Sequence, residues 1–133
     1  MNAVDSHPDR ATPPRLAVIE DDASVARALA RLLRSWDYDV ETFESAEEFL
    51  GRPDDSGHDC LVLDVHLPGL DGVELQAQLR AEGSSVPVIF ITAYDAEDAR
   101  RNALADGASA FLHKPLDTVV LLQEIARVLG LEG

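Results

Sequence analysis

The feature that most constrains the fold of this chain is a repeated alternation between short apolar runs and segments of helical character. Each apolar run is followed by a segment with helical spacing of apolar residues or with a helix-start signal. Apolar strands joined by helices predict a parallel sheet covered on both faces, and right-handed crossovers make it a doubly wound α/β sandwich. The predicted strands are 15–20, 38–43, 60–64, 86–92 and 108–114.

The helical segments have clear start signals. Ser45 followed by Glu48 has the spacing of a capping box and predicts a short second helix. Asp71 with Glu74 predicts the start of the third helix, and Asp95 is expected to cap the fourth. The first helix is expected to bury one apolar stripe, which consists of Val25, Ala28, Leu29, Leu32, Leu33 and Trp36.

Length and composition limit the range of architectures and partners. The chain has 133 residues, which suits one domain at 15–133, preceded by a polar, proline-containing tail at 1–14 that we expect to be disordered. The formal net charge of -14 argues against unaided nucleic-acid binding and against an anionic membrane surface. No apolar stretch could span a bilayer and no signal peptide is evident, so we expect a cytoplasmic protein. Cys60, the one cysteine, is expected to be buried and inert.

Polar residues stand where the predicted strands end. Glu20, Asp21 and Asp22 close the first run, Asp64 the third, Thr92 the fourth and Lys114 the fifth. Ligands bind outside the carboxyl ends of the strands in open α/β sheets, so these residues are expected to converge on one edge.

This set of side chains indicates phosphoryl chemistry with a metal ion. Clustered carboxylates repel unless they are protonated or hold a cation, and hard oxygen ligands suit Mg²⁺. Asp64 has the chemistry of a nucleophile that forms an acyl phosphate, with Lys114 neutralising charge and Thr92 donating a hydrogen bond. Taken singly, each residue has a plainer interpretation as a turn residue or a helix cap. The placement of all of them at the same ends of the strands favours a site.

The segments "AVIEDD", "LVLDVHLPGLDG", "VIFITA" and "FLHKP" together resemble the receiver domain of bacterial two-component response regulators. The resemblance covers about Arg15 to Leu131. It implies a flavodoxin-like receiver fold, with a five-stranded parallel sheet in the order 2-1-3-4-5 and five helices.

The resemblance also implies roles for single residues. Asp64 would accept a phosphoryl group from a histidine kinase or a histidine phosphotransfer protein. Mg²⁺ would be held by Glu20, Asp21 and Asp64, with Glu20 acting through water, and by the backbone carbonyl of His66. Thr92 would move toward the phosphoryl group, and Lys114, in a cis peptide with Pro115, would pair with its oxygens.

Three variable positions keep two interpretations each. His66 tunes dephosphorylation or is a bystander, and Tyr94 gates access to the site or caps a loop. Phe111 matches an aromatic switch position that turns inward with the threonine, or it belongs to the core.

The main alternative is a pseudo-receiver, an interaction module of the same fold that works without phosphorylation. A phosphatase of the haloacid-dehalogenase type would need a second aspartate where His66 stands, and a flavodoxin-like cofactor binder would need a phosphate loop where the first acids stand. A receiver is not an enzyme in the usual sense, because it catalyses only its own phosphorylation and dephosphorylation. If the chain is complete, we expect a stand-alone receiver acting on a downstream protein, without direct nucleic-acid contact. The resemblance implies that the contact surface involves the fourth helix, fifth strand and fifth helix, and a homodimer through that face is one option.

Overall fold

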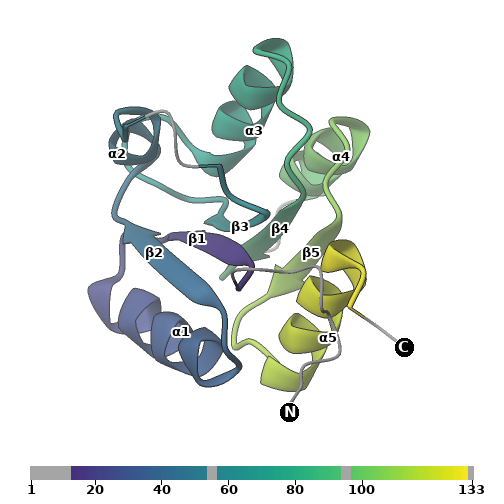
Figure 1. Ribbon diagram of the computed structural model, residues 1–133. Coiled ribbons are helices and arrows are strands. Elements are labelled where there is room, and N and C mark those ends of the chain that lie inside the picture. Colours follow the sequence, from purple (N-terminus) through teal and green to yellow (C-terminus); the bar gives the residue numbers. More distant parts are fainter. Residues whose placement is uncertain (1–12, 54–56, 94–96, 132–133) are drawn as a thin grey trace.

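A computed structural model describes residues 13–53, 57–93 and 97–131. Within these ranges the chain forms one five-stranded sheet with five helices (Figure 1). The strands are β1 (Arg15–Ile19), β2 (Asp39–Phe43), β3 (Cys60–Asp64), β4 (Val88–Thr92) and β5 (Ala110–His113). The helices are α1 (Ala23–Ser35), α2 (Ala46–Leu50), α3 (Gly72–Ala81), α4 (Glu97–Ala105) and α5 (Thr118–Leu129).

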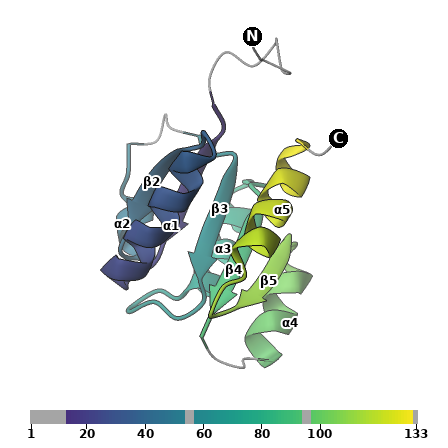
Figure 2. The same ribbon diagram turned by 90° about the horizontal axis from the view of Figure 1, so that it is seen from below.

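The sheet has the strand order β2-β1-β3-β4-β5, and every neighbouring pair is parallel. This confirms the predicted doubly wound architecture and the strand order. Helices α1 and α5 cover one face, and α2, α3 and α4 cover the other, as the two views in Figures 1 and 2 show. Strands β1, β3 and β4 are apolar almost throughout because helices cover them on both sides.

Two apolar clusters, one on each face, hold the layers together. On one face, Phe49 of α2, Leu75 of α3 and Ala103 of α4 pack against the sheet. On the other face, Leu33 of α1 and Ile125 of α5 do the same. Burial of these side chains is the main favourable term for the fold.

The register of the sheet brings the carboxyl ends of the strands to one edge. Ile19 pairs with Leu63, so the next residues on these two neighbouring strands, Glu20 and Asp64, lie at the same edge. Thr92 pairs with His113, so Lys114, the residue after β5, lies at this edge as well.

The helix caps mostly follow the sequence signals. The Asp71 and Glu74 side chains form a full capping box at the start of α3. The Ser45 side chain accepts the Glu48 amide, but the Glu48 carboxylate accepts the amide of Glu44 in place of that of Ser45. The predicted cap at Asp95 lies outside the described residues, and so does the predicted tail up to residue 12.

One expectation for α1 was wrong. Trp36 was assigned to the buried stripe, but α1 ends at Ser35 and Trp36 is 61% exposed. The chain leaves the helix here because Asp37 adopts a left-handed conformation, with φ of 68°, on the way to β2. Ala28 is exposed as well, whereas Ala26 is buried. Among the described helices, none has the length and apolarity needed to cross a membrane.

Candidate functional site

Buried polar side chains mark the carboxyl edge of the sheet. In the part of the chain that the structure describes, the buried polar or charged residues are Glu20, Asp64, Gln76 and Thr92. Three of them lie at the ends of β1, β3 and β4, where the sequence predicted a site. A buried charge needs a partner, so the surroundings of Glu20 and Asp64 decide what this edge can do.

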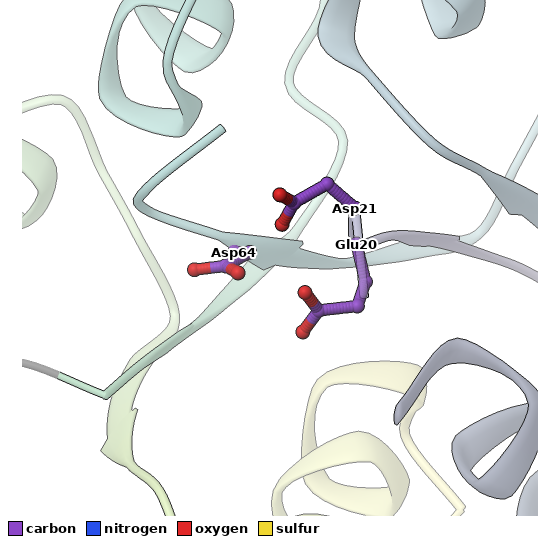
Figure 3. A group of neighbouring side chains, drawn as sticks. All are labelled: Glu20, Asp21 and Asp64. Atoms are coloured by element: carbon purple, nitrogen blue, oxygen red, sulfur yellow. The ribbon is translucent and has the colours of Figure 1, made fainter. Parts of the chain in front are cut away.

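Three carboxylates come together at this edge. Glu20, Asp21 and Asp64 each offer one oxygen, and these oxygens lie within 4.8 Å of one another. Figure 3 shows the carboxylates of Glu20 and Asp21 pointing to the side on which Asp64 lies. Asp22 does not join them, because its side chain caps α1 by accepting the amides of Ser24 and Val25.

Lys114 supplies the positive charge of the cluster. Its Nζ lies 2.7 Å from Oε1 of Glu20 and 3.3 Å from Oδ2 of Asp64. The backbone amide of Lys114 donates to the Thr92 carbonyl at 2.7 Å, and the peptide bond to Pro115 is cis, as predicted. Lys114 is the only lysine of the chain. The contact therefore joins residues from three separate strand ends.

Burial and charge shift the titration of two of these groups. Burial raises the pKa of Glu20 above its ordinary value, and hydrogen bonds from Lys114 and from the Asp22 amide only partly oppose this. Burial lowers the pKa of Lys114, but the hydrogen bond to Glu20 and the charges of Asp64 and Glu20 outweigh it, so the net pKa is raised. A cation bound beside Glu20 would favour its charged form, because an opposite charge lowers the pKa of a carboxyl group.

The backbone around Asp64 is tightly organised. The amide of His66 donates to Oδ1 of Asp64 at 3.0 Å. Gly72, at the start of α3, packs directly on this strand end, because a Cβ added there would lie 2.2 Å from the Asp64 carbonyl oxygen. The amide of Gly72 also donates to the carbonyl of Val65 at 2.9 Å. Only glycine fits this close approach.

Two further predicted residues lie on β4 and β5. Thr92 is fully buried at the end of β4. The Phe111 ring on β5 is half-buried, with its centroid 5.8 Å from that of Phe90 in the core. Tyr94 lies outside the described residues.

The donor set fits Mg²⁺. Carboxylate oxygens are the hard ligands that this ion takes in proteins, and a few of them with water complete its shell. Burial is the main cause of the raised pKa of Glu20, and the neighbouring Asp64 adds to it. The residues suited to hold the ion are Glu20, Asp21 and Asp64.

Some roles were not found from the sequence. Glu47 of α2 reaches the loop after β3 and accepts the Leu70 amide at 2.8 Å. The one sequence signal for this contact is Gly69, the first glycine of "LPGLDG". It marks a turn at this point of the loop, where the backbone has a φ of 74°. The His58 side chain, in the loop before β3, is 2% exposed, and its Nε2 lies 2.7 Å from Oε1 of Glu41. Cys60 is buried as predicted, and burial raises its pKa to about 12.

Comparison with known proteins identifies the family. The family model described as "Response regulator receiver domain" matches residues 16–126. The chain therefore belongs to the receiver domains of two-component response regulators, a family of signalling domains. Receiver domains interact with histidine kinases and with downstream effectors.

Related proteins agree with this assignment. The transcriptional regulatory protein TdiR of Thauera aromatica is 40% identical over 114 residues, which are 86% of this chain and 50% of that protein. The structure of the response regulator StyR is 42% identical with a TM-score of 0.83, covering 90% of this chain and 61% of that one. A response regulator receiver protein from Burkholderia phymatum is 44% identical with a TM-score of 0.78, covering 90% and 98%.

The chain spans about half the length of the curated relatives that it matches, with 50% of TdiR and 52% of Nodulation protein W of Bradyrhizobium diazoefficiens covered. TdiR is named a transcriptional regulatory protein. The expectation that this chain makes no direct nucleic-acid contact therefore stays a prediction.

Proposed function

We propose that this chain is a phosphorylation-dependent switch in which Asp64 accepts a phosphoryl group from a histidine kinase or a histidine phosphotransfer protein. The observation that carries the proposal is the double contact of Lys114 Nζ, at 2.7 Å to Glu20 and 3.3 Å to Asp64. It sets a cation beside a nearly buried carboxylate at a strand end, next to two further acids. This is the arrangement that phosphoryl transfer to a carboxylate requires.

In the proposed reaction, a carboxylate oxygen of Asp64 attacks the phosphorus of a phosphohistidine. A phosphorus–oxygen bond forms, the phosphorus–nitrogen bond breaks, and the imidazole leaves with the electron pair and gains a proton. Lys114 pairs with the phosphoryl oxygens, and the Thr92 hydroxyl donates a hydrogen bond to one of them. The chain thus catalyses only its own phosphorylation and the hydrolysis that reverses it.

Glu20, Asp21, Asp64 and the backbone carbonyl of His66 are the proposed ligands of Mg²⁺, with Glu20 acting through water. When bound, the ion would supply positive charge to the carboxylates and to the phosphoryl oxygens. The geometry of the three carboxylates supports this assignment.

The proposed output is a shift between two conformations. Phosphorylation favours the one in which Thr92 and Phe111 are turned toward the site, and this changes the surface formed by α4, β5 and α5. That surface then controls a downstream protein or pairs with a second copy of the chain. The proposal places these events in the cytoplasm, where response regulators generally work.

The test is the intact mass of the protein after incubation with Mg²⁺ and acetyl phosphate. We expect one added phosphoryl group, which is absent from the Asp64→Asn variant and from a sample with EDTA. If no group is added and Mg²⁺ with beryllofluoride also fails to bind, the switch is disproved and a phosphorylation-independent interaction module remains.

A further inference from the structure

The loop that follows Asp64 is anchored at both of its ends. We call residues 65–71 the acceptor loop. At its start, the His66 amide donates to Asp64 and the Val65 carbonyl accepts the Gly72 amide. At its end, the Asp71 side chain takes part in the capping box of α3. These contacts lie within the β3–α3 connection itself.

Two hydrogen bonds reach the acceptor loop from other elements. At its start, the Val65 amide donates to the Ile91 carbonyl of β4 at 3.0 Å. The carboxylate of Glu47, in the first turn of α2, accepts the Leu70 amide at 2.8 Å, across 23 residues of sequence. A Cβ added at Gly69 would lie 2.6 Å from Oε2 of Glu47, so the carboxylate rests directly on this glycine. Glycine thus fits position 69 for two reasons: the backbone there has a φ of 74°, and a side chain would meet the Glu47 carboxylate.

Helix α2, which carries Glu47, is held in place by apolar packing and by an N-terminal cap. Ala46 and Phe49, which flank Glu47 on α2, are 0% and 1% exposed, and both belong to the apolar cluster under the sheet. The Ser45 side chain caps the helix by accepting the Glu48 amide. A carboxylate held on such a helix restrains the backbone that it binds, because its own position is fixed by packing.

We propose that Glu47 is a positioning residue for the acceptor site. By holding the Leu70 amide, it keeps the acceptor loop in the conformation in which the His66 backbone faces Asp64 and the metal position. The inference rests on the Mg²⁺-dependent role proposed above for Asp64. It extends the site to a helix that contributes no ligand and no reacting group.

The neighbouring residue provides a matched control. Glu48 lies on the same helix, and its Oε1 accepts the amide of Glu44 at 2.6 Å. Glu47→Ala and Glu48→Ala each remove one carboxylate-to-amide hydrogen bond from an exposed position of α2. Only the first of these bonds reaches the acceptor loop. Glu47→Gln keeps an oxygen that accepts the Leu70 amide and serves as the rescue variant.

Two readouts separate positioning from stability. The first is the Mg²⁺ dissociation constant, measured by calorimetry. We expect it to rise about 3- to 10-fold in Glu47→Ala and to change less than about twofold in Glu48→Ala. In Glu47→Gln it should be close to that of the unmodified protein. The second is hydrogen exchange of the Leu70 amide in metal-free protein. We expect faster exchange in Glu47→Ala and unchanged exchange in Glu48→Ala.

A second variant tests the contact from the other side. Gly69→Ala places a methyl group against the Glu47 carboxylate and should also weaken Mg²⁺ binding. Its effect should be smaller when Glu47 is already alanine, because the atom that the methyl group meets has then gone.

The inference is overturned if Glu47→Ala and Glu48→Ala bind Mg²⁺ equally well, or if Leu70 exchange is the same in both. Either result would make Glu47 a contributor to stability alone, while the proposed function would stand. If the unmodified protein binds no Mg²⁺ and gains no phosphoryl group, the proposed function fails first and the inference falls with it.

Discussion

The ammonium nitrogen of Lys114 lies 2.7 Å from Oε1 of Glu20, although 94 residues separate them in the chain. The Glu20 side chain is 1% exposed and that of Lys114 is 21% exposed. The pair is therefore largely withdrawn from water, and the ammonium of Lys114 balances the charge of the buried carboxylate. Removing the lysine from such a pair leaves buried carboxylates without their cation, which costs more than breaking an exposed pair, whereas Lys114 keeps Asp64 at 3.3 Å when Glu20 loses its charge.

The first prediction is that Lys114→Met destabilises the metal-free protein. The substitution leaves Glu20, Asp21 and Asp64 close together without their cation, so we expect the free energy of unfolding to fall by about 1–3 kcal/mol. Chemical denaturation in EDTA measures it. Arg101→Met is the control, because its pair with Asp98 is exposed on α4 and should contribute less than about 0.5 kcal/mol. Equal effects of the two variants would contradict the account.

The second prediction concerns the titration of Lys114, which NMR can follow by itself because the chain has no other lysine. Its pKa should lie above the ordinary value of 10.5, since Glu20 and Asp64 outweigh the effect of burial. The stabilisation from this ammonium is then present below pH 10.5 and is lost as the pH rises through the higher folded value. Glu20→Gln should bring the pKa of Lys114 down. A midpoint at or below 10.5 in the unmodified protein would be inconsistent with the geometry.

The third prediction is a conflict between stability and metal binding at Glu20. Burial raises its pKa above 4.5, so the folded protein holds this proton more tightly than the unfolded chain does. The stability that it contributes is present below pH 4.5 and is lost as the pH rises through the folded value, which makes the charged form unfavourable near neutrality. Glu20→Gln should therefore raise the thermal midpoint in EDTA at neutral pH.

Bound Mg²⁺ should reverse the order of stability of the unmodified protein and Glu20→Gln. Added Mg²⁺ should stabilise the unmodified protein more than Glu20→Gln, because a ligand that binds the folded state more tightly stabilises it more at the same concentration. Thermal unfolding with and without the ion measures both effects. A variant that is less stable in EDTA, or one that gains as much from Mg²⁺, would show that Glu20 does not have this double role.

The fourth prediction uses two glycines. Gly72→Ala forces a methyl group to within 2.2 Å of the Asp64 carbonyl oxygen, so β3 or α3 must move. We expect a loss of about 1–3 kcal/mol in the free energy of unfolding, together with weaker Mg²⁺ binding. Gly57→Ala is the matched control, because nothing lies within 4 Å of the added atom. Denaturation curves that coincide for the two variants would disprove the close packing at Gly72.

Much of this fold could be predicted from local patterns. The strands of the sheet centre are apolar and short, and caps such as Asp71 mark where helices begin. The strand order came from the family resemblance, and the structure confirms it. The convergence of Glu20, Asp64 and Lys114 followed from a general property of parallel sheets, namely that their carboxyl ends share one edge.

Other features depend on contacts that no local pattern contains. Trp36 continues the helical spacing of α1, but the chain turns at Asp37 and leaves the ring in solvent. Glu47 resembles any acid in the first turn of a helix, and its partner Leu70 belongs to another connection. Gln76 is polar yet fully buried on α3, facing the end of α4. Such residues are explained only when the elements are packed together.

The most direct test of the central claim is to locate the phosphoryl group. Borohydride reduces an aspartyl phosphate to homoserine and releases phosphate, so peptide mapping after treatment with acetyl phosphate and Mg²⁺ identifies the acceptor. We expect homoserine at position 64 and at no other acid, including Asp21, and none in samples treated with EDTA. Homoserine at another position, or its persistence at other acids in the Asp64→Asn variant with unchanged yield, would contradict the claim that Asp64 is the acceptor.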